Sequence, residues 1–64
     1  MPNQYVYYYS IECYTPDGRS EWYHGKTDYP VPLTWHDIRI IAESEAPMRF
    51  ISFGEFEVTH EEYR

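Results

Sequence analysis

The side chains that could carry out catalysis are few and lie far apart in the sequence. His24, His36 and His60 fall in three different predicted elements, so local structure brings no two of them together. Ser10 could form a hydrolase triad with His24 and a carboxylate, but no nucleophile elbow surrounds this serine. Cys13 lies on the predicted core face, which favours a buried, inert thiol over a reactive one. We therefore expect no enzymatic activity.

The sequence contains no motif that matches a metal-binding or a phosphate-binding site. The run His60–Glu62 and the pair His36-Asp37 contain suitable ligand types, but neither has the spacing of a zinc or calcium site. Gly54 has no second glycine beside it, so the chain contains no phosphate-cradling loop. The single cysteine excludes an internal disulfide and a cysteine-based zinc site. We expect no metal and no other cofactor.

The chemistry that the sequence favours is electrostatic. The 64 residues include 11 Asp and Glu against 5 Lys and Arg, a formal net charge of −6. This charge argues against binding nucleic acid directly and against docking on an anionic membrane. Arg49 is the one basic residue in a stretch with six glutamates, which are Glu43, Glu45, Glu55, Glu57, Glu61 and Glu62.

Two interpretations of these carboxylates remain open. They can be read as a solvated surface that keeps a tyrosine-rich domain soluble. They can also be read as an array that takes the place of DNA phosphates on a basic partner. Carboxylates that alternate along a strand lie ~7 Å apart, close to the separation of successive phosphates.

Aromatic side chains make up 20% of the sequence, and eight of them are tyrosines. Because these rings can supply burial, we expect a folded chain and not an acidic disordered one. One sheet face is predicted to display Val6, Tyr8, Tyr14, Trp22 and Phe50 among the carboxylates Glu12, Glu55 and Glu57. Such a face is typical of a partner-binding or homodimer interface, since Tyr and Trp dominate binding hot spots. The alternative is a small domain with more apolar residues than it can bury.

A hairpin predicted over residues 4–26 must position most of these side chains. Residues 4–14 are rich in aromatic and β-branched types and contain no breaker. Residues 15–18, with the sequence TPDG, are typical of a type I turn followed by a glycine bulge. This turn sets a register in which Glu12 pairs with Trp22 on the face opposite the core.

A helix is predicted over residues 34–44. Thr34 is a favourable N-cap, and Asp37 completes a variant of the capping box. The proline of Ala46-Pro47 ends the helix. One apolar stripe then faces the sheet, formed by Trp35, Ile38, Ile41 and Ala42.

Residues 48–59 return to the period of two that predicts a strand. Gly54 lies where the phase of the pattern changes, which predicts a β-bulge. With the bulge, Ile51, Phe53, Phe56 and Val58 point inward, whereas Phe50, Glu55 and Glu57 point outward. Residues 60–64 are predicted to form a frayed end.

Together these elements predict a single α+β domain over residues 1–64, with the order β-β-α-β(β). The sheet is antiparallel with three to four strands, and the helix packs on one face. Placing the last strand beside the first gives the strand order 2-1-3 and leaves the other face open. No apolar run is long enough for a transmembrane span or a signal peptide. The cysteine content favours a reducing, cytoplasmic context.

In size, charge and layout the whole chain resembles the small acidic inhibitors that bacteriophages make against host defence. The group is the anti-CRISPR proteins, several of which are DNA mimics. The resemblance rests on the six glutamates together with Tyr8, Tyr14 and Trp22, and on no sequence motif. It implies a partner-binding surface made of Glu12, Glu43, Glu45, Glu55, Glu57, Glu61, Glu62, Tyr8, Tyr14 and Trp22.

The resemblance implies a basic DNA-binding partner, such as a CRISPR effector subunit in the host bacterial cytoplasm. Inhibition would follow from occupancy of its nucleic-acid channel, without chemistry. We expect a monomer or a homodimer that binds neither nucleic acid nor membrane itself. The alternative function is that of a small accessory or structural module that binds a protein through its Tyr/Trp sheet face.

Overall fold

A β-hairpin forms the N-terminal half of the chain in the computed structural model, which describes residues 3–64. Its two ten-residue strands are β1 (Tyr5–Tyr14) and β2 (Ser20–Tyr29). The connecting turn closes with Thr15 N donating to the Arg19 carbonyl at 2.9 Å, and Gly18 adopts a φ of 86°. That left-handed conformation is accessible to glycine without steric cost. The predicted turn is therefore confirmed.

The predicted pairing of the hairpin is confirmed along its whole length. Glu12 pairs with Trp22, and Tyr8 pairs with Lys26. The second strand is longer than predicted, because it continues past Lys26 to Tyr29 opposite the start of β1. The first proline after β2 is Pro30, which cannot donate a ladder hydrogen bond and so ends the strand.

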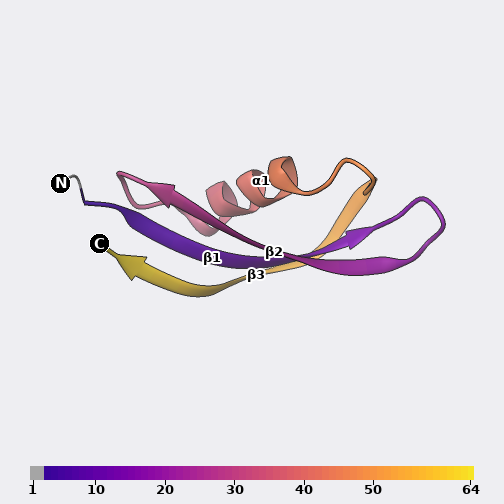
Figure 1. Ribbon diagram of the computed structural model, residues 1–64, viewed down its shortest axis with the longest axis horizontal. Helices are drawn as coiled ribbons and strands as arrows, with labels where there is room; N and C mark the ends of the chain where they lie inside the picture. The colour runs from indigo at the N-terminus through magenta and orange to yellow at the C-terminus, as the bar shows by residue number, and fades with distance from the viewer. Residues whose placement is uncertain (1–2) are drawn as a thin grey trace.

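The C-terminal strand, β3 (Ser52–Tyr63), pairs antiparallel with β1 and gives the sheet order β2-β1-β3 (Figure 1). The predicted bulge is present: Ile11 pairs with Phe56 and Cys13 with Phe53, so Gly54 and Glu55 together face Glu12. A second register shift, at Thr59, was not predicted.

The predicted bounds of this strand, 48–59, are wrong at both ends. Its last residues are paired rather than frayed, since Arg64 N donates to the Gln4 carbonyl at 2.8 Å. The rings of Tyr5 and Tyr63 also lie 4.8 Å apart. Backbone pairing and ring contact with the start of β1 therefore hold the C-terminal end in the sheet.

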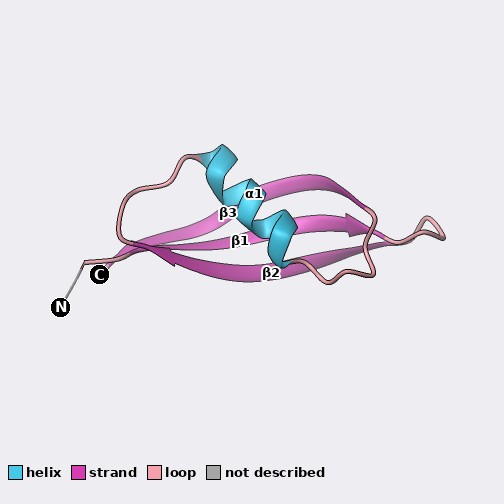
Figure 2. Ribbon diagram, turned by 90° about the horizontal axis from the view of Figure 1, so that it is seen from above, coloured by secondary structure: helices cyan, strands magenta, loops and turns pink. Residues whose placement is uncertain are grey.

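The helix α1 (Trp35–Glu45) confirms the predicted helix to within a residue at each end. Thr34 is the N-cap, and its hydroxyl accepts from Asp37 N at 3.1 Å while the Asp37 carboxylate accepts from Thr34 N at 3.2 Å. Figure 2 shows the helix crossing one face of the sheet. The architecture is α+β, with one helix on an open three-stranded sheet.

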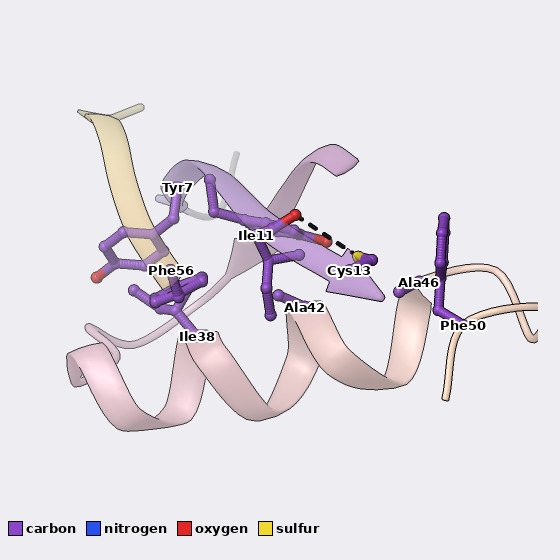
Figure 3. Close-up of a cluster of buried hydrophobic side chains, with 9 residues drawn as sticks. Tyr7, Ile11, Cys13, Ile38, Ala42, Ala46, Phe50 and Phe56 are labelled. Carbon is purple, nitrogen blue, oxygen red and sulfur yellow. Dashed lines mark hydrogen bonds between the residues drawn. The ribbon is translucent and has the colours of Figure 1, made fainter. Parts of the chain in front are cut away.

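The core lies between α1 and the sheet (Figure 3). Phe50 was predicted to point outward but is only 8% exposed, because the connection after α1 turns back and Phe50 N donates to the Pro47 carbonyl at 3.2 Å. Ile51 was predicted to point inward but is 66% exposed, because it precedes the start of β3. The buried side chains that form this core cluster are Tyr7, Tyr9, Ile11, Cys13, Ile38, Ala42, Ala46, Phe50 and Phe56.

Trp35 departs from the predicted apolar stripe. Half of its surface is exposed, and its ring meets Phe56 edge-on at 5.0 Å at the margin of the core. The guanidinium of Arg39 lies 5.7 Å from the centre of the Trp35 ring. Trp35 therefore covers the core edge instead of filling the interior.

Tyr9 connects the hairpin to the end of α1. Its ring lies over Gly25, where an added Cβ would stand 2.5 Å from Tyr9 Cζ and 2.7 Å from Cε1. Its hydroxyl donates to Glu45 Oε2 at 2.6 Å. Burial, reinforced by this carboxylate, raises the pKa of Tyr9 above its usual range. Position 25 must therefore be glycine for Tyr9 to reach Glu45.

Candidate partner-binding site

The sheet face opposite α1 has no element covering it among residues 3–64 (Figure 1). We call it the open face; it carries every second side chain of β1 with their neighbours on β2 and β3. Val6 was predicted to be displayed here, but it is buried, as is Ser10. Because these two central positions are shielded, the accessible groups on this face come mainly from its flanking strands.

The sheet register brings several predicted site residues together at one end of the open face. Glu12 lies between Trp22 on β2 and the Gly54–Glu55 bulge on β3. Glu57 lies two pairs further along, opposite Ser10. We call Glu12, Tyr14, Trp22, Glu55 and Glu57 the acidic-aromatic end.

A hollow of about 440 Å³ lies at the acidic-aromatic end and is lined by Trp22, Glu55, Phe56 and Glu57. The indole of Trp22 is 46% exposed beside it. This places an accessible aromatic surface next to two carboxylates. Such a hollow has the chemistry to receive a cationic side chain, which can stack on the ring and bond to the acids.

The bulge at Gly54 shapes this end of the face. A Cβ at position 54 would lie 2.6 Å from Glu12 Oε1 and 2.8 Å from the Tyr14 hydroxyl, so glycine leaves room for both side chains. From the helix side, Arg39 Nη2 donates to the Gly54 carbonyl at 3.0 Å. Arg39 of α1 therefore helps to fix the bulge from the helix side of the sheet.

Tyr14 and Glu12 form a pair on the surface of this end. The Tyr14 hydroxyl donates to Glu12 Oε1 at 2.9 Å. This hydrogen bond, with the nearby carboxylates, raises the pKa of Tyr14. The bond directs the Glu12 carboxylate along the open face toward Gly54.

The carboxylates at this end are not neutralised within the protein. Among residues 3–64, no Lys or Arg lies within ion-pairing distance of Glu12, Glu55 or Glu57. The arginines pair elsewhere: Arg19 with Asp17 at 3.2 Å, Arg39 with Glu43 at 2.9 Å, Arg49 with Glu21 at 3.2 Å and Arg64 with Glu62 at 2.6 Å. Three uncompensated carboxylates therefore share one end of one face.

The other end of the open face has mixed charge. Tyr8 lies beside His60, with ring centres 5.6 Å apart, and its hydroxyl accepts from Arg64 at 3.3 Å. His60 Nε2 and Arg64 both contact Glu62. The Arg64 guanidinium lowers the pKa of Glu62. Tyr8 and Glu62, both predicted to bind a partner, thus belong to a locally balanced cluster.

The remaining predicted carboxylates lie on the helix side. Glu43 pairs with Arg39, and Glu45 accepts from Tyr9. Glu61 pairs in register with Tyr7, a core-facing residue, so it points away from the open face. The six glutamates between residues 43 and 62 therefore do not form a single array, because the two sides of the sheet divide them.

The catalytic candidates come together only in part. Ser10 Oγ and His24 Nδ1 share a hydrogen bond at 2.7 Å, although Ser10 is buried. Cys13 is buried, and its burial raises the pKa of the thiol. Within residues 3–64, no group of three His, Cys, Asp or Glu side chains could hold a metal ion. Over the same residues, no helix has the length and apolar character needed to cross a membrane.

Comparisons with protein-family models, with curated proteins and with solved structures find no match to this chain. The geometry of the open face is therefore the basis of the functional argument. The predicted hairpin register places Ser10 opposite His24, and the structure confirms this pairing, whereas the separation of the glutamates was not predicted.

Proposed function

We propose that this chain is a non-enzymatic inhibitor or interaction protein whose acidic-aromatic end occupies a basic nucleic-acid-binding site on a partner protein. One observation carries the proposal: Glu12, Glu55 and Glu57 lie together on an uncovered sheet face without internal ion pairs. Cationic side chains that normally contact phosphates would bond to these carboxylates instead. Inhibition follows from occupancy alone.

Arginine suits this surface better than lysine. Its planar guanidinium can accept stacking on Trp22 while donating two parallel hydrogen bonds to Glu55 or Glu57. Residues that alternate along a strand lie ~7 Å apart on one face. Glu55 and Glu57, two residues apart on β3, therefore offer a partner two contacts at about the spacing of successive phosphates, and Glu12 on β1 offers a third beside them.

The overall charge favours the encounter with such a partner. A net charge of −6 attracts a basic surface before contact, and this steering weakens as salt screens it. Host DNA-binding proteins, including CRISPR effector subunits in the bacterial cytoplasm, have surfaces of the required kind. The resemblance to small phage-encoded inhibitors points to that class of partner.

A second candidate function is that of an accessory module that binds a protein through the aromatic side chains. The exposed indole of Trp22 favours it, because exposed aromatic rings supply binding energy at interfaces. Binding of this kind depends on buried apolar area. It would change little with salt concentration.

Affinity capture from a bacterial lysate separates the two functions. The immobilised protein is exposed to lysate at about 0.05 M and about 0.5 M salt, and the bound proteins are identified by mass spectrometry. We expect DNA-binding proteins at low salt, lost at high salt and lost when Glu55 and Glu57 are both replaced by lysine. The matched control replaces Glu21 and Glu61, which lie on the helix side and change the net charge equally. Salt-insensitive capture that survives the Glu55/Glu57 change would favour the aromatic module.

A further inference from the structure

The two edges of the sheet differ in how well they are protected. β3 has two register shifts, and Arg39 binds the carbonyl of Gly54 at its bulge. β2 pairs with β1 over ten residues without a shift and has no proline between Ser20 and Tyr29. Regular edges of this length offer a template for another strand, whereas bulges and charges discourage pairing. β2 carries the charged side chains Glu21, Lys26 and Asp28, but no bulge and no proline interrupts its backbone, so it is the more regular edge.

The backbone of β2 offers hydrogen-bonding groups to a further strand. Thr15 N donates to the Arg19 carbonyl, so alternation along an antiparallel ladder directs the backbone groups of Glu21 and Tyr23 toward β1. Those of Trp22, His24 and Lys26 then point outward. Among residues 3–64, no hydrogen bond from another segment reaches these outward groups. β2 therefore makes its backbone hydrogen bonds on the side that faces β1 and, within the described residues, makes none on its outer side.

We propose that the β2 edge pairs with the β2 edge of a second copy, antiparallel about His24, to form a continuous six-stranded sheet. The proposal does not rest on the function suggested above. With the two-fold axis at His24, Trp22 lies opposite Lys26 of the second copy, and Ser20 lies opposite Asp28. The backbone groups of His24 in the two copies bond to each other.

Side-chain chemistry favours this register over its neighbours. Lys26 has no ion-pair partner among residues 3–64, and here its ammonium can rest on the Trp22 indole of the other copy. Moving the axis to Gly25 would place Lys26 opposite His24 instead of Trp22 and bring Pro30, which has no N–H, opposite Ser20. The His24-centred register avoids both, places His24 opposite its own copy, and sets no two carboxylates and no two Lys or Arg side chains directly opposite each other.

This pairing leaves the carboxylates of the acidic-aromatic end accessible, whereas the Trp22 indole comes into contact with Lys26 of the second copy. Residues that face each other across an antiparallel pair lie on the same side of the sheet, so both open faces are continuous. Glu12, Glu55 and Glu57 lie on β1 and β3, away from the new pairing. Because backbone bonds at one edge form a small interface, we expect weak association, with a dissociation constant on the order of 100 µM.

The test compares His24→Pro with His24→Ala by sedimentation velocity between about 1 µM and about 1 mM protein. Both variants lose the imidazole, but only proline removes the outward N–H at the axis without removing a bond to β1. We expect wild type and His24→Ala to dimerise similarly and His24→Pro to weaken dimerisation about tenfold or more. Circular dichroism establishes that both variants are folded.

Amide hydrogen exchange of the wild-type protein gives a second readout that needs no variant. At dimer-forming concentrations the amides of Trp22, His24 and Lys26 should exchange more slowly than in dilute solution. A monomer up to about 1 mM would overturn the proposal. A dimer that leaves these amides unprotected, or one that His24→Pro does not weaken, would also overturn it. Slower exchange of these amides that appears only when another protein is added would overturn the proposal as well.

Discussion

Replacing Gly25 with alanine tests the contact that connects the hairpin to the helix. The new Cβ would stand 2.5 Å from Tyr9 Cζ, which is closer than real Cβ atoms approach other heavy atoms. Tyr9 cannot move away cheaply, because it is buried and its hydroxyl is bonded to Glu45. Overpacking of this kind costs ~1–3 kcal/mol. Loss of a hydrogen bond to a charged group adds ~1.5–3 kcal/mol if the ring is displaced.

Alanine also restricts the unfolded chain, which offsets ~0.4–1 kcal/mol of this cost. We therefore expect Gly25→Ala to lower the free energy of unfolding by about 2–4 kcal/mol, a large part of the stability of so small a domain. Urea titration followed by circular dichroism measures the change. In a Tyr9→Leu background the overlapping ring atoms are absent, so the same replacement should be nearly neutral. A Gly25→Ala protein as stable as wild type would refute the placement of Tyr9.

Three other outcomes follow from the same structure. Ile38→Ala should lower the free energy of unfolding by ~2–5 kcal/mol because it leaves a core cavity, and Thr34→Ala should lower it by ~1 kcal/mol because it removes the N-cap. Urea titration measures both changes, and equal effects would contradict the described packing. Gly54→Ala should destabilise far less than Gly25→Ala, because it displaces the ends of Glu12 and Tyr14 at the surface; melting curves of the two variants give the comparison. Because the pKa of Tyr9 is raised in the folded protein, the stability that its protonated hydroxyl contributes is fully present below pH ~10, the unfolded pKa. That stability is lost as the pH rises from there through the folded-state pKa. Wild type should therefore lose stability above pH ~10 more steeply than Tyr9→Phe, and parallel loss would contradict this.

The parts of the fold that were predictable depend on neighbouring residues in the chain. The TPDG turn sets the hairpin register because Gly18 can adopt a positive φ, and Thr34 with Asp37 marks the start of the helix. The change of phase at Gly54 predicted the bulge beside Glu12. Each of these signals acts over a few residues, so sequence pattern was sufficient.

The parts that were missed depend on segments far apart in sequence. Phe50 and Ile51 exchanged their predicted environments because the path of the connection after α1 is set by packing on the helix end. Tyr9 reaches Glu45 only because Gly25, on another strand, has no side chain. No local pattern contains that information.

The candidate site was predicted in composition but not in arrangement. Glu12, Trp22, Glu55 and Glu57 do share an uncovered face, as the hairpin register and the bulge imply. Glu61 and Glu62 were grouped, but adjacent residues on a strand point to opposite faces. Because residues 60–64 were predicted to be frayed and not part of the strand, this alternation of Glu61 and Glu62 was not predicted.

Competition with DNA for a captured DNA-binding partner tests the central claim most directly. A gel shift of that partner on its DNA is titrated with wild type, with Glu55→Lys/Glu57→Lys and with Glu21→Lys/Glu61→Lys. The two double variants carry the same net charge and change opposite sides of the sheet, and Glu21→Lys also removes the exposed Arg49–Glu21 pair. We expect wild type and the Glu21/Glu61 variant to displace the DNA and the Glu55/Glu57 variant to fail. Equal displacement by both double variants would contradict a binding site at the acidic-aromatic end.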